Sequence, residues 1–540
     1  MSVSPLAPFR HATFRSLWTA TLASNLGGLV QTVGAAWMMT TISTSDDMVA
    51  LVQASTTLPI MIFSLAAGVL ADSFDRRKVM LVAQVLMMVI STGLAIFAVA
   101  GWLSPWLLLA FTFCIGCGTA LHNPSWQASM GDLVPREDLP GAVTLNSMSY
   151  NLMRSIGPAV GGLIVALAGA AFAFAVNAVS YIALIRALAR WKPERVVSTL
   201  PRESFGSALS VGLGYIALSP NLLKVMCRSF IFGFAAVSVL ALLPLVTRDL
   251  VEGGAFSYGV ILGCFGVGAL CGAWMNARVR DRWGNETIVR TTFVIFALSV
   301  VGLALSRQMW LSCLAVLPAG ACWVLTLSLF NVTVQLSTPR WVVGRALSFY
   351  QTATFGGMAA GSWIWGLSAD AYGTDSALMG SGVVLVLGAV MGLRYILPEF
   401  SKLSLDPADR FNEPTLKLDL RARSGPILIT VDYEIAQQDI GAFLSLMAQR
   451  RRIRLRDGAR QWSLLRDLES PSVWTESYHV PTWVAYVRHH QRRTQADAEV
   501  FDRLLALHRG ESAPRVRRMI ERQTVPIRDD MPLKEHTDIP

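Results

Sequence analysis

Arg154 is the residue in this sequence whose type and position most directly imply chemistry. It lies well inside an apolar segment that is long enough to cross a membrane, just before Gly157 and Pro158. An arginine at that depth costs at least about 2.5–3.5 kcal/mol, so its side chain should face a wet cavity or the interior of a helix bundle. Two interpretations stay open. It is either a cation that binds an anionic substrate group or counters a mobile proton, or a structural arginine bonded to backbone carbonyls.

His122 is the second candidate, because it is the only histidine at membrane depth and imidazole titrates near physiological pH. A lone histidine in such a segment can equally be a packing residue. Side-chain amides in apolar segments also need partners, because lipid offers none. Most should join helices and some should line a path for a substrate or a proton. The candidates for this path are Asn25, Gln31, Asn331 and Gln335.

Other reactive groups are missing from the places where catalysis would use them. Every Asp and Glu before residue 400 lies in a loop or near the end of an apolar segment. The sequence has no G-x-x-x-x-G-K-[ST] loop, no nucleophile–base–acid arrangement and no metal-ligand spacing. All seven cysteines lie in apolar segments, where we interpret Cys114 and Cys117 as packing residues. We therefore predict that the protein is not an enzyme and holds no metal and no cofactor.

The composition predicts which elements position these residues. Of 540 residues, 53% are hydrophobic and 15% are charged. Residues 1–400 carry 39 charged side chains, whereas the much shorter stretch 401–540 carries 43. This excludes a single soluble globule and indicates a membrane body followed by a soluble tail. The net charge of +10 is spread over both parts, so we predict a lipid bilayer, and not nucleic acid, as the partner surface.

Twelve apolar runs have the roughly 20 residues that a membrane-spanning helix needs. They are 14–42, 49–71, 79–100, 105–128, 143–167, 170–189, 224–247, 256–277, 287–306, 309–335, 345–369 and 376–397. Basic residues gather in the loops on the side of the two termini, whereas the loops of the other side carry only Arg248 and Arg307. By the positive-inside rule, both termini are cytoplasmic.

An internal repeat organises these runs. A shift of 204 residues matches loop and helix positions of the first six runs with those of the last six. Matched pairs include Gly68 with Gly272, Arg76 with Arg280, Arg136 with Arg340, Gly157 with Gly361 and Gly162 with Gly366. Because six spans return the chain to the same side, we predict two parallel six-helix halves related by an axis along the membrane normal.

Three stretches carry a resemblance to a known family. The loop from Gly68 to Lys78 resembles the G-x-x-x-D-R/K-x-G-R/K-R/K loop of the major facilitator superfamily, with Ser73 and Asp75 as departures. The stretch from Gly157 to Gly162, GPAVGG, is similar to the end of a motif of exporters in that superfamily. Residues 123–147, with NPSWQ and VPREDL, resemble more specifically the bacterial enterobactin-exporter-like branch, also called the transmembrane secretion effector family.

The resemblance implies an all-α polytopic fold and a secondary transporter of the bacterial inner membrane. Such a protein would export a siderophore- or drug-like small molecule by alternating access, in exchange for protons. The resemblance also implies a conformational latch, formed by Gly68, Asp72, Arg76 and Asp132, and a helix-packing motif, formed by Gly157, Pro158, Gly161 and Gly162. No residue supports the proton coupling, because Gly27 and Gly28 stand where some relatives carry an acid.

The tail has a different periodicity. Alternating runs predict strands at 427–435, 462–468, 473–480 and 516–520, with helices at 437–452 and 482–508. This β-α-β-β-α-β order is typical of a ferredoxin-like domain and resembles the dimeric α+β barrels that include antibiotic-biosynthesis monooxygenases. An alternative function is therefore a membrane-tethered, monooxygenase-like or ligand-sensing domain. In it, Trp462, Trp474, His479 and Trp483 would line a cavity, unless they are core aromatics.

Two interaction surfaces and a domain plan follow. The basic run Arg450–Arg456 is interpreted as a face attracted to anionic lipid, and the open sheet is expected to favour self-association. The predicted parts are an N-terminal six-helix half (1–190), a cytoplasmic central loop (191–223), a C-terminal six-helix half (224–400), a linker (401–425), a cytoplasmic ferredoxin-like domain (426–522) and a disordered tail (523–540).

Overall fold

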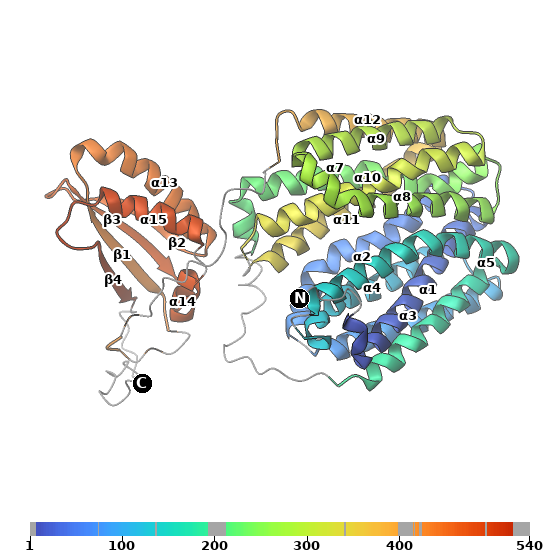
Figure 1. Ribbon diagram of the computed structural model, residues 1–540, viewed down its shortest axis with the longest axis horizontal. Helices are drawn as coiled ribbons and strands as arrows, with labels where there is room; N and C mark the ends of the chain where they lie inside the picture. Colours follow the sequence, from blue (N-terminus) through green and yellow to red (C-terminus); the bar gives the residue numbers. More distant parts are fainter. Residues whose placement is uncertain are drawn as a thin grey trace. The chain divides into compact units, whose positions relative to one another are not determined.

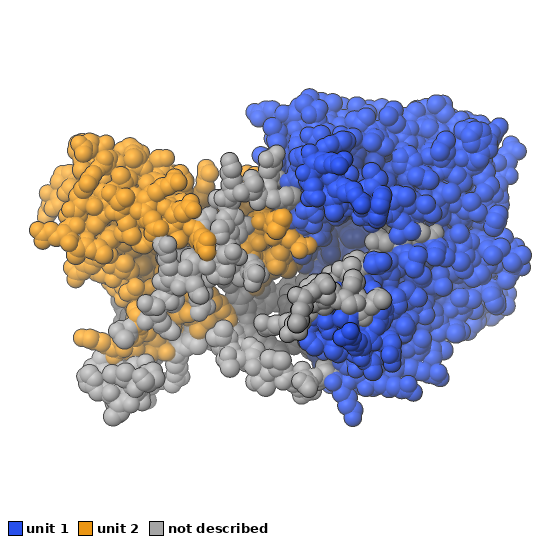
Figure 2. Space-filling model, viewed as in Figure 1, with its two compact units in different colours: residues 1–202, 224–334, 347–399 blue, residues 203–223, 335–346, 400–540 orange. Residues whose placement is uncertain are grey.

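A computed structural model describes residues 7–73, 75–135, 138–192, 212–339, 342–397, 414, 416–418, 420, 424–491 and 494–521. The predicted tail 523–540 and most of the predicted linker 401–425 lie outside these residues. Contacts within the chain divide it into two compact units, which Figure 2 colours separately. Unit 1 contains residues 1–202, 224–334 and 347–399, and unit 2 contains residues 203–223, 335–346 and 400–540.

Unit 1 is a bundle of long helices (Figure 1). Its first half contains η1 (Ala7–Arg10), α1 (Ala12–Ile42), α2 (Asp46–Ser73), α3 (Arg76–Val99), α4 (Pro105–Leu133) and α5 (Leu139–Arg190). The element α5 covers two of the predicted spans. Gly169 breaks it with a φ of 82°, a conformation that favours glycine because other residues have a Cβ.

The second half of the bundle contains α7 (Pro220–Leu245), η2 (Val246–Leu250), α8 (Ala255–Arg282), α9 (Asn285–Leu305), α10 (Met309–Leu336), α11 (Val343–Tyr372) and α12 (Thr374–Met391). The start of α7, the end of α10 and the start of α11 belong to unit 2. Among the described residues, nine helical segments are long and apolar enough to cross a membrane. The prediction of many apolar spans is confirmed, and their number stays a prediction.

Apolar side chains lie both inside and on the outside of this bundle. A buried cluster joins α1, α3, α4 and α5 through Phe14, Leu17, Met80, Trp126 and Leu184. Large apolar residues elsewhere on unit 1 are exposed, among them Val82, Val89, Leu167, Leu298 and Val383. An exposed apolar surface of this extent needs a cover in water, and lipid provides one.

Unit 2 contains a four-stranded antiparallel sheet in the order β2-β3-β1-β4. The elements are β1 (Ile427–Glu434), η3 (Gln437–Asp439), α13 (Ile440–Arg456), β2 (Arg460–Arg466), β3 (Val473–Val480), α14 (Trp483–Gln491), α15 (Gln495–Leu507) and β4 (Arg515–Ile520). Alternate residues of β1 and β3 are buried, and they form a core with Phe443, Met447, Trp483, Tyr486 and Leu504 of the helices. The predicted small sheet is therefore confirmed.

One helix prediction for unit 2 is wrong. Residues 482–508 form two helices, α14 and α15, where a single one is predicted. The second helix starts anew because Thr494 and Asp497 form a capping box, in which each side chain bonds to the backbone N–H of the other residue.

Candidate functional site

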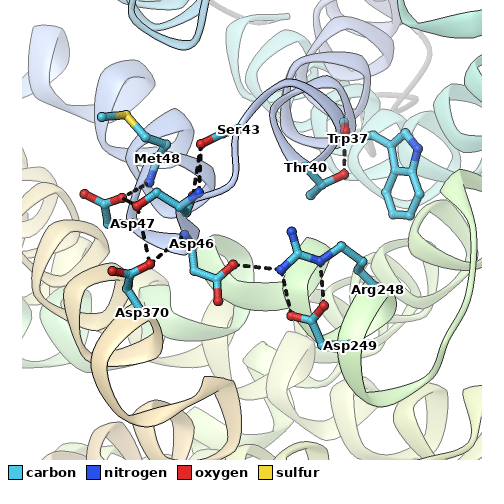
Figure 3. Close-up of polar contacts among 10 residues, drawn as sticks. Trp37, Thr40, Ser43, Asp46, Asp47, Met48, Arg248, Asp249 and Asp370 are labelled. Carbon is cyan, nitrogen blue, oxygen red and sulfur yellow. Dashed lines mark hydrogen bonds and ion pairs between the residues drawn. The ribbon is translucent and has the colours of Figure 1, made fainter.

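The candidate site is the contact between the two halves of unit 1 at one end of the bundle. We call this the far end; the α1–α2, α7–α8 and α11–α12 connections lie there, opposite the start of α1. Arg248 of η2 donates from Nη2 to Asp46 Oδ1 of α2 at 2.7 Å, and from Nε to its neighbour Asp249 at 2.5 Å (Figure 3). The guanidinium thus joins a carboxylate of the first half to one of the second half.

A second carboxylate of the second half holds the same connection. Asp370 of α11 accepts from the backbone N–H of Asp46 at 3.1 Å and from Ser45 Oγ at 3.3 Å (Figure 3). Ser45 also donates to Asp47, whose carboxylate accepts from the N–H of Met48 at 2.7 Å. The turn that starts α2 is therefore fixed by its own side chains and by η2 and α11 of the other half. We call Arg248, Asp46, Asp249 and Asp370 the far-end gate.

Backbone packing also joins the two halves. A Cβ built on Gly259 of α8 would lie 2.6 Å from Cα of Gly162 and 2.8 Å from the carbonyl oxygen of Pro158, both of α5. The two helices touch backbone to backbone, which only glycine permits. Tyr258, the residue before Gly259 in α8, stacks on Trp37 of α1 with the two ring centroids 6.2 Å apart.

The predicted packing motif therefore has two faces. Gly157 and Gly161 lie against α1, where a Cβ would meet Leu29 and Val33 respectively, and Gly162 lies against α8. Glycines on both faces let α5 pack closely against its own half and against the opposite half.

One predicted pathway residue lies in a buried polar network. Gln31 is 5% exposed, and its Oε1 accepts from Ser91 Oγ at 2.6 Å and from Asn177 Nδ2 at 2.5 Å. Asn177 also donates to Tyr181 at 3.0 Å. These residues come from α1, α3 and α5, so the structure supports joining of helices within the first half as the role of Gln31. Asn25 of α1 is half-buried.

The remaining pathway candidates lie on other helices than Gln31. His122 of α4 is 7% exposed and stacks on Trp126 at 6.4 Å, and its Nδ1 has no hydrogen-bond partner among the described residues. Asn331 of α10 is half-buried, and Gln335 of the same helix is exposed. Arg154 belongs to α5, and its side chain lies outside the described residues.

The predicted latch is brought together in part. Arg76 Nη1 of α3 donates to Asp132 Oδ2 of α4 at 2.9 Å, and each side chain is about one-third exposed. Arg77 donates to the carbonyl oxygens of Leu188 and Ala189 at the end of α5, at 2.9 and 2.7 Å. Gly68 and Asp72 belong to α2, but their side-chain surroundings lie outside the described residues.

Comparison with known proteins decides the family. Residues 3–524 match the family described as transmembrane secretion effector. The chain belongs to this family. It is 22% identical over 351 residues to the staphyloferrin A transporter of Staphylococcus aureus, which covers 64% of this chain and 87% of that protein. It is also 26% identical over 227 residues to macrolide efflux protein A of Enterococcus faecalis, covering 39% of this chain and 70% of the relative.

Solved structures show the same fold. A bacterial homologue of the human lysosomal transporter Spinster, in an inward-facing conformation, has a TM-score of 0.56 at 14% identity and covers 72% of this chain and 97% of its own. A D-xylose–proton symporter has a TM-score of 0.57 at 16% identity, covering 72% and 99%. These structures show the fold alone; the matched family and its transporter relatives show that this secretion effector is a multi-pass membrane transporter of the major facilitator type.

Sequence reasoning missed a buried ion pair of the secretion effector. Arg228 of α7 is 1% exposed and donates to Glu286 of α9 at 2.6 Å, and Glu286 also accepts from the N–H of Leu397 at 3.0 Å. The Arg228 Nε and Nη2 atoms have no partner among the described residues. An arginine placed several residues inside an apolar run was the available signal. The pair ties the start of α7 and of α9 to the chain that leaves α12.

Unit 2 contains a second buried charge cluster. Glu476 of β3 is fully buried and accepts from Arg450 at 2.8 Å, Arg454 at 3.1 Å and Trp462 Nε1 at 3.1 Å. Burial alone would raise the pKa of Glu476, but the two guanidinium groups outweigh it and hold this pKa well below its usual range. Arg454 also contacts His489 at 2.8 Å.

Two interpretations of unit 2 change accordingly. The basic run is not one lipid-facing surface, because Arg450 and Arg454 point into the core; only Arg451 and Arg452 are exposed. Trp474 and Trp483 are buried among core residues, which favours the core interpretation of the aromatic set over a cavity. His479 is half-buried on the opposite face of β3. No group of three or more potential metal ligands occurs among the described residues.

Proposed function

We propose that this transporter exports a siderophore- or drug-like small molecule across the bacterial inner membrane by alternating access. The observation that carries the proposal is the far-end gate. In this gate Arg248 and Asp370 of the second half bond to Asp46 of the first half, and Gly162 touches Gly259 as well; each of these contacts breaks if the halves separate at that end. The relatives named as a staphyloferrin A transporter and a macrolide efflux protein suggest the direction and the class of substrate.

The proposed orientation places the far end outside the cytoplasm, because basic residues gather in the opposite loops. In the described state the outer end is closed, which corresponds to loading from the cytoplasm. Release then requires Arg248 to leave Asp46, so that α8 can move away from α5. The Arg76–Asp132 pair lies at the opposite end, within the first half, and we propose that it stabilises one of the two states together with Asp72.

The finer assignments belong to the same proposal. We assign twelve spans in two parallel halves, membership of the enterobactin-exporter-like branch, and a cytoplasmic ferredoxin-like domain. The strand order β2-β3-β1-β4 supports the last assignment, with α14 and α15 together in the place of the second helix of that fold. Proton exchange is the proposed energy source, and two copies of the same domain pair through the open sheet in this proposal.

Accumulation in cells tests the export. A strain that lacks the protein should retain more of one or more compounds from a panel of siderophores and macrolides than the complemented strain. Equal retention across the panel would contradict export. Collapse of the proton gradient with an uncoupler should abolish the difference, and a difference that survives the uncoupler would contradict proton exchange.

Arg154 is tested in the same cells. Conversion to Ala and to Lys should abolish transport while the protein stays folded in the membrane, because only a guanidinium presents the planar fork of donors that matches a carboxylate or phosphate. The matched control is Arg186→Lys, since Arg186 is exposed on the same element. Normal transport by both Arg154 variants would leave this residue a structural role.

A further inference from the structure

The last part of the connection between the two halves belongs to unit 2. Residues 203–223 lie in the same compact unit as the C-terminal domain, and residues 212–217 form a helical turn that leads into α7. Within this turn, Tyr215 and Ile216 are each only 3% exposed. Two large side chains buried within eight residues indicate a docked segment, because a freely moving connection would leave them in water.

Arg456 is the residue that receives Tyr215. Its guanidinium carbon lies 5.2 Å from the centre of the Tyr215 ring, within the range of a cation–π contact. Burial raises the pKa of the Tyr215 hydroxyl well above its ordinary value, more than the nearby Arg456 lowers it. The ring therefore stays neutral, and the contact depends on its π face and not on a tyrosinate.

Two carboxylates fix the position of the Arg456 guanidinium. Its Nε donates to Asp457 at 3.0 Å and its Nη2 donates to Asp497 at 2.7 Å. Asp497 is fixed in turn by the capping box with Thr494 that starts α15. The end of α13 and the start of α15 thus orient the Arg456 guanidinium. This lowers the entropic cost of docking Tyr215, because the Arg456 side chain is already ordered.

The same connecting segment meets another part of the chain on its other side. A Cβ built on Gly212 would lie 3.1 Å from Cδ of Arg345. Arg345 lies in the first turn of α11, and residues 335–346, from the end of α10 to the start of α11, are also part of unit 2. Unit 2 therefore gathers the domain, the segment before α7 and the segment between α10 and α11.

We propose that the cytoplasmic domain acts as a coupling device that clamps the inter-half connection through Tyr215 and Arg456. Alternating access requires the two halves to move relative to each other, and the connection between them must follow. Docking its last residues onto a folded domain restricts that motion. Any change in the domain, such as binding of a partner to it, would then alter the rate at which the halves rearrange.

Hydrogen exchange of the full chain in lipid nanodiscs measures the clamp without reference to transport. In Tyr215→Ala, exchange of the amides at 212–219 should accelerate about 30-fold, which corresponds to loss of one desolvated cation–π contact. Arg456→Gln should do the same. Tyr215→Phe keeps the ring and should exchange as the native protein does. Arg452→Gln is the matched control, because Arg452 is exposed on the same helix.

Transport by the same variants measures the coupling, and this arm alone rests on the proposed export. The initial rate should change at least threefold in Tyr215→Ala and stay unchanged in Tyr215→Phe and Arg452→Gln. Because Arg456→Gln removes the guanidinium that Asp457 and Asp497 share, the conclusion relies on Tyr215→Ala, which leaves that cluster intact.

Two results would overturn the proposal. Unaltered exchange at 212–219 in Tyr215→Ala would show that this contact does not hold the segment. Faster exchange with a native transport rate would show that the segment is docked without being coupled. If no substrate is transported by the native protein, the export proposal fails, whereas the exchange result still decides whether the clamp exists.

Discussion

Gly259→Ala is the substitution with the clearest expected effect on the state of the transporter. The added methyl group would lie 2.6 Å from Cα of Gly162 and 2.8 Å from the carbonyl oxygen of Pro158. Both are backbone atoms of α5, so no change of rotamer relieves the overlap. The methyl group fits only if α5 and α8 separate at the far end, which is the movement that opens the gate.

The size of the effect follows from the overlap. An extra methyl group in a well-packed contact costs about 1–3 kcal/mol when the backbone has to shift. Because the open state lacks this contact, the whole cost falls on the closed state. A difference of about 1–3 kcal/mol changes the ratio of the two states by about 5- to 150-fold. The variant should therefore open at the far end much more often than the native protein.

Thiol labelling measures this opening directly. In a variant whose native cysteines are replaced by serine, Thr40→Cys introduces a reporter that is half-buried next to the gate (Figure 3). A membrane-impermeant maleimide added on the far side should label it about 5- to 150-fold faster when Gly259→Ala is also present. Transport should slow in parallel, because the closed state is needed for loading.

The matched control separates the contact from the loss of a helical glycine. In Gly302→Ala the methyl group would lie 3.5 Å from Cβ of Ala315, which is an ordinary distance. This variant should label at the native rate. If Gly259→Ala also labels at the native rate and transports normally, the glycine contact does not hold the far end closed, and the reasoning is refuted.

Three further substitutions test the charge clusters. Arg248→Gln should accelerate far-side labelling less than about fivefold, because a partly exposed pair contributes about 0.2–1 kcal/mol; high salt should reduce the difference, and Arg307→Gln, at a more exposed pair, should have no effect. Glu476→Gln should destabilise unit 2 by about 3–5 kcal/mol, because two buried guanidinium groups lose their counter-charge. The lowered folded-state pKa of Glu476 means that its stabilisation is present above the unfolded-state pKa and is lost as the pH falls; acid melting curves of the full chain should show this for the native protein and not for the variant. Arg228→Met should destabilise the fold by a similar free energy, which size-exclusion profiles should show as a smaller folded fraction. A compensating Glu286→Leu should restore the folded fraction.

The helices of unit 1 could be predicted because a membrane span requires about 20 consecutive, predominantly apolar residues, and the sequence shows such runs directly. The run 287–306 is predominantly apolar, with Arg290 as its one charged residue, and the structure has α9 at Asn285–Leu305. The far-end gate left no such signal. Arg248 and Asp46 are 202 residues apart in sequence, and each is an ordinary loop charge until the fold brings them to 2.7 Å. Helices depend on residues that are close in sequence and could be predicted, whereas the gate depends on residues that are far apart in sequence and could not.

The basic run of unit 2 shows the same limit on a smaller scale. Five arginines within residues 450–456 suggest a charged surface. Arg450 and Arg454 are one helical turn apart, however, and Glu476 occupies an inward position of β3, which alternation alone would assign to an apolar residue. The strand pattern predicted the sheet, but only the packing of α13 on β3 reveals that the two arginines and the carboxylate satisfy one another.

The repeat at 204 residues adds a consequence to the gate. Gly162 and its counterpart Gly366 both face the opposite half, since Gly162 lies against α8 and a Cβ on Gly366 would lie 2.7 Å from Cβ of Ala50 in α2. The ion pair has no such counterpart, because position 44, which matches Arg248, is a threonine. The backbone contacts thus agree with the predicted repeat and the charges do not. Gly366→Ala should open the far end as Gly259→Ala does, and the double variant should combine both effects, since the contacts share no atoms. An effect confined to Gly259 would show that the contact of Gly366 with α2 does not hold the far end closed.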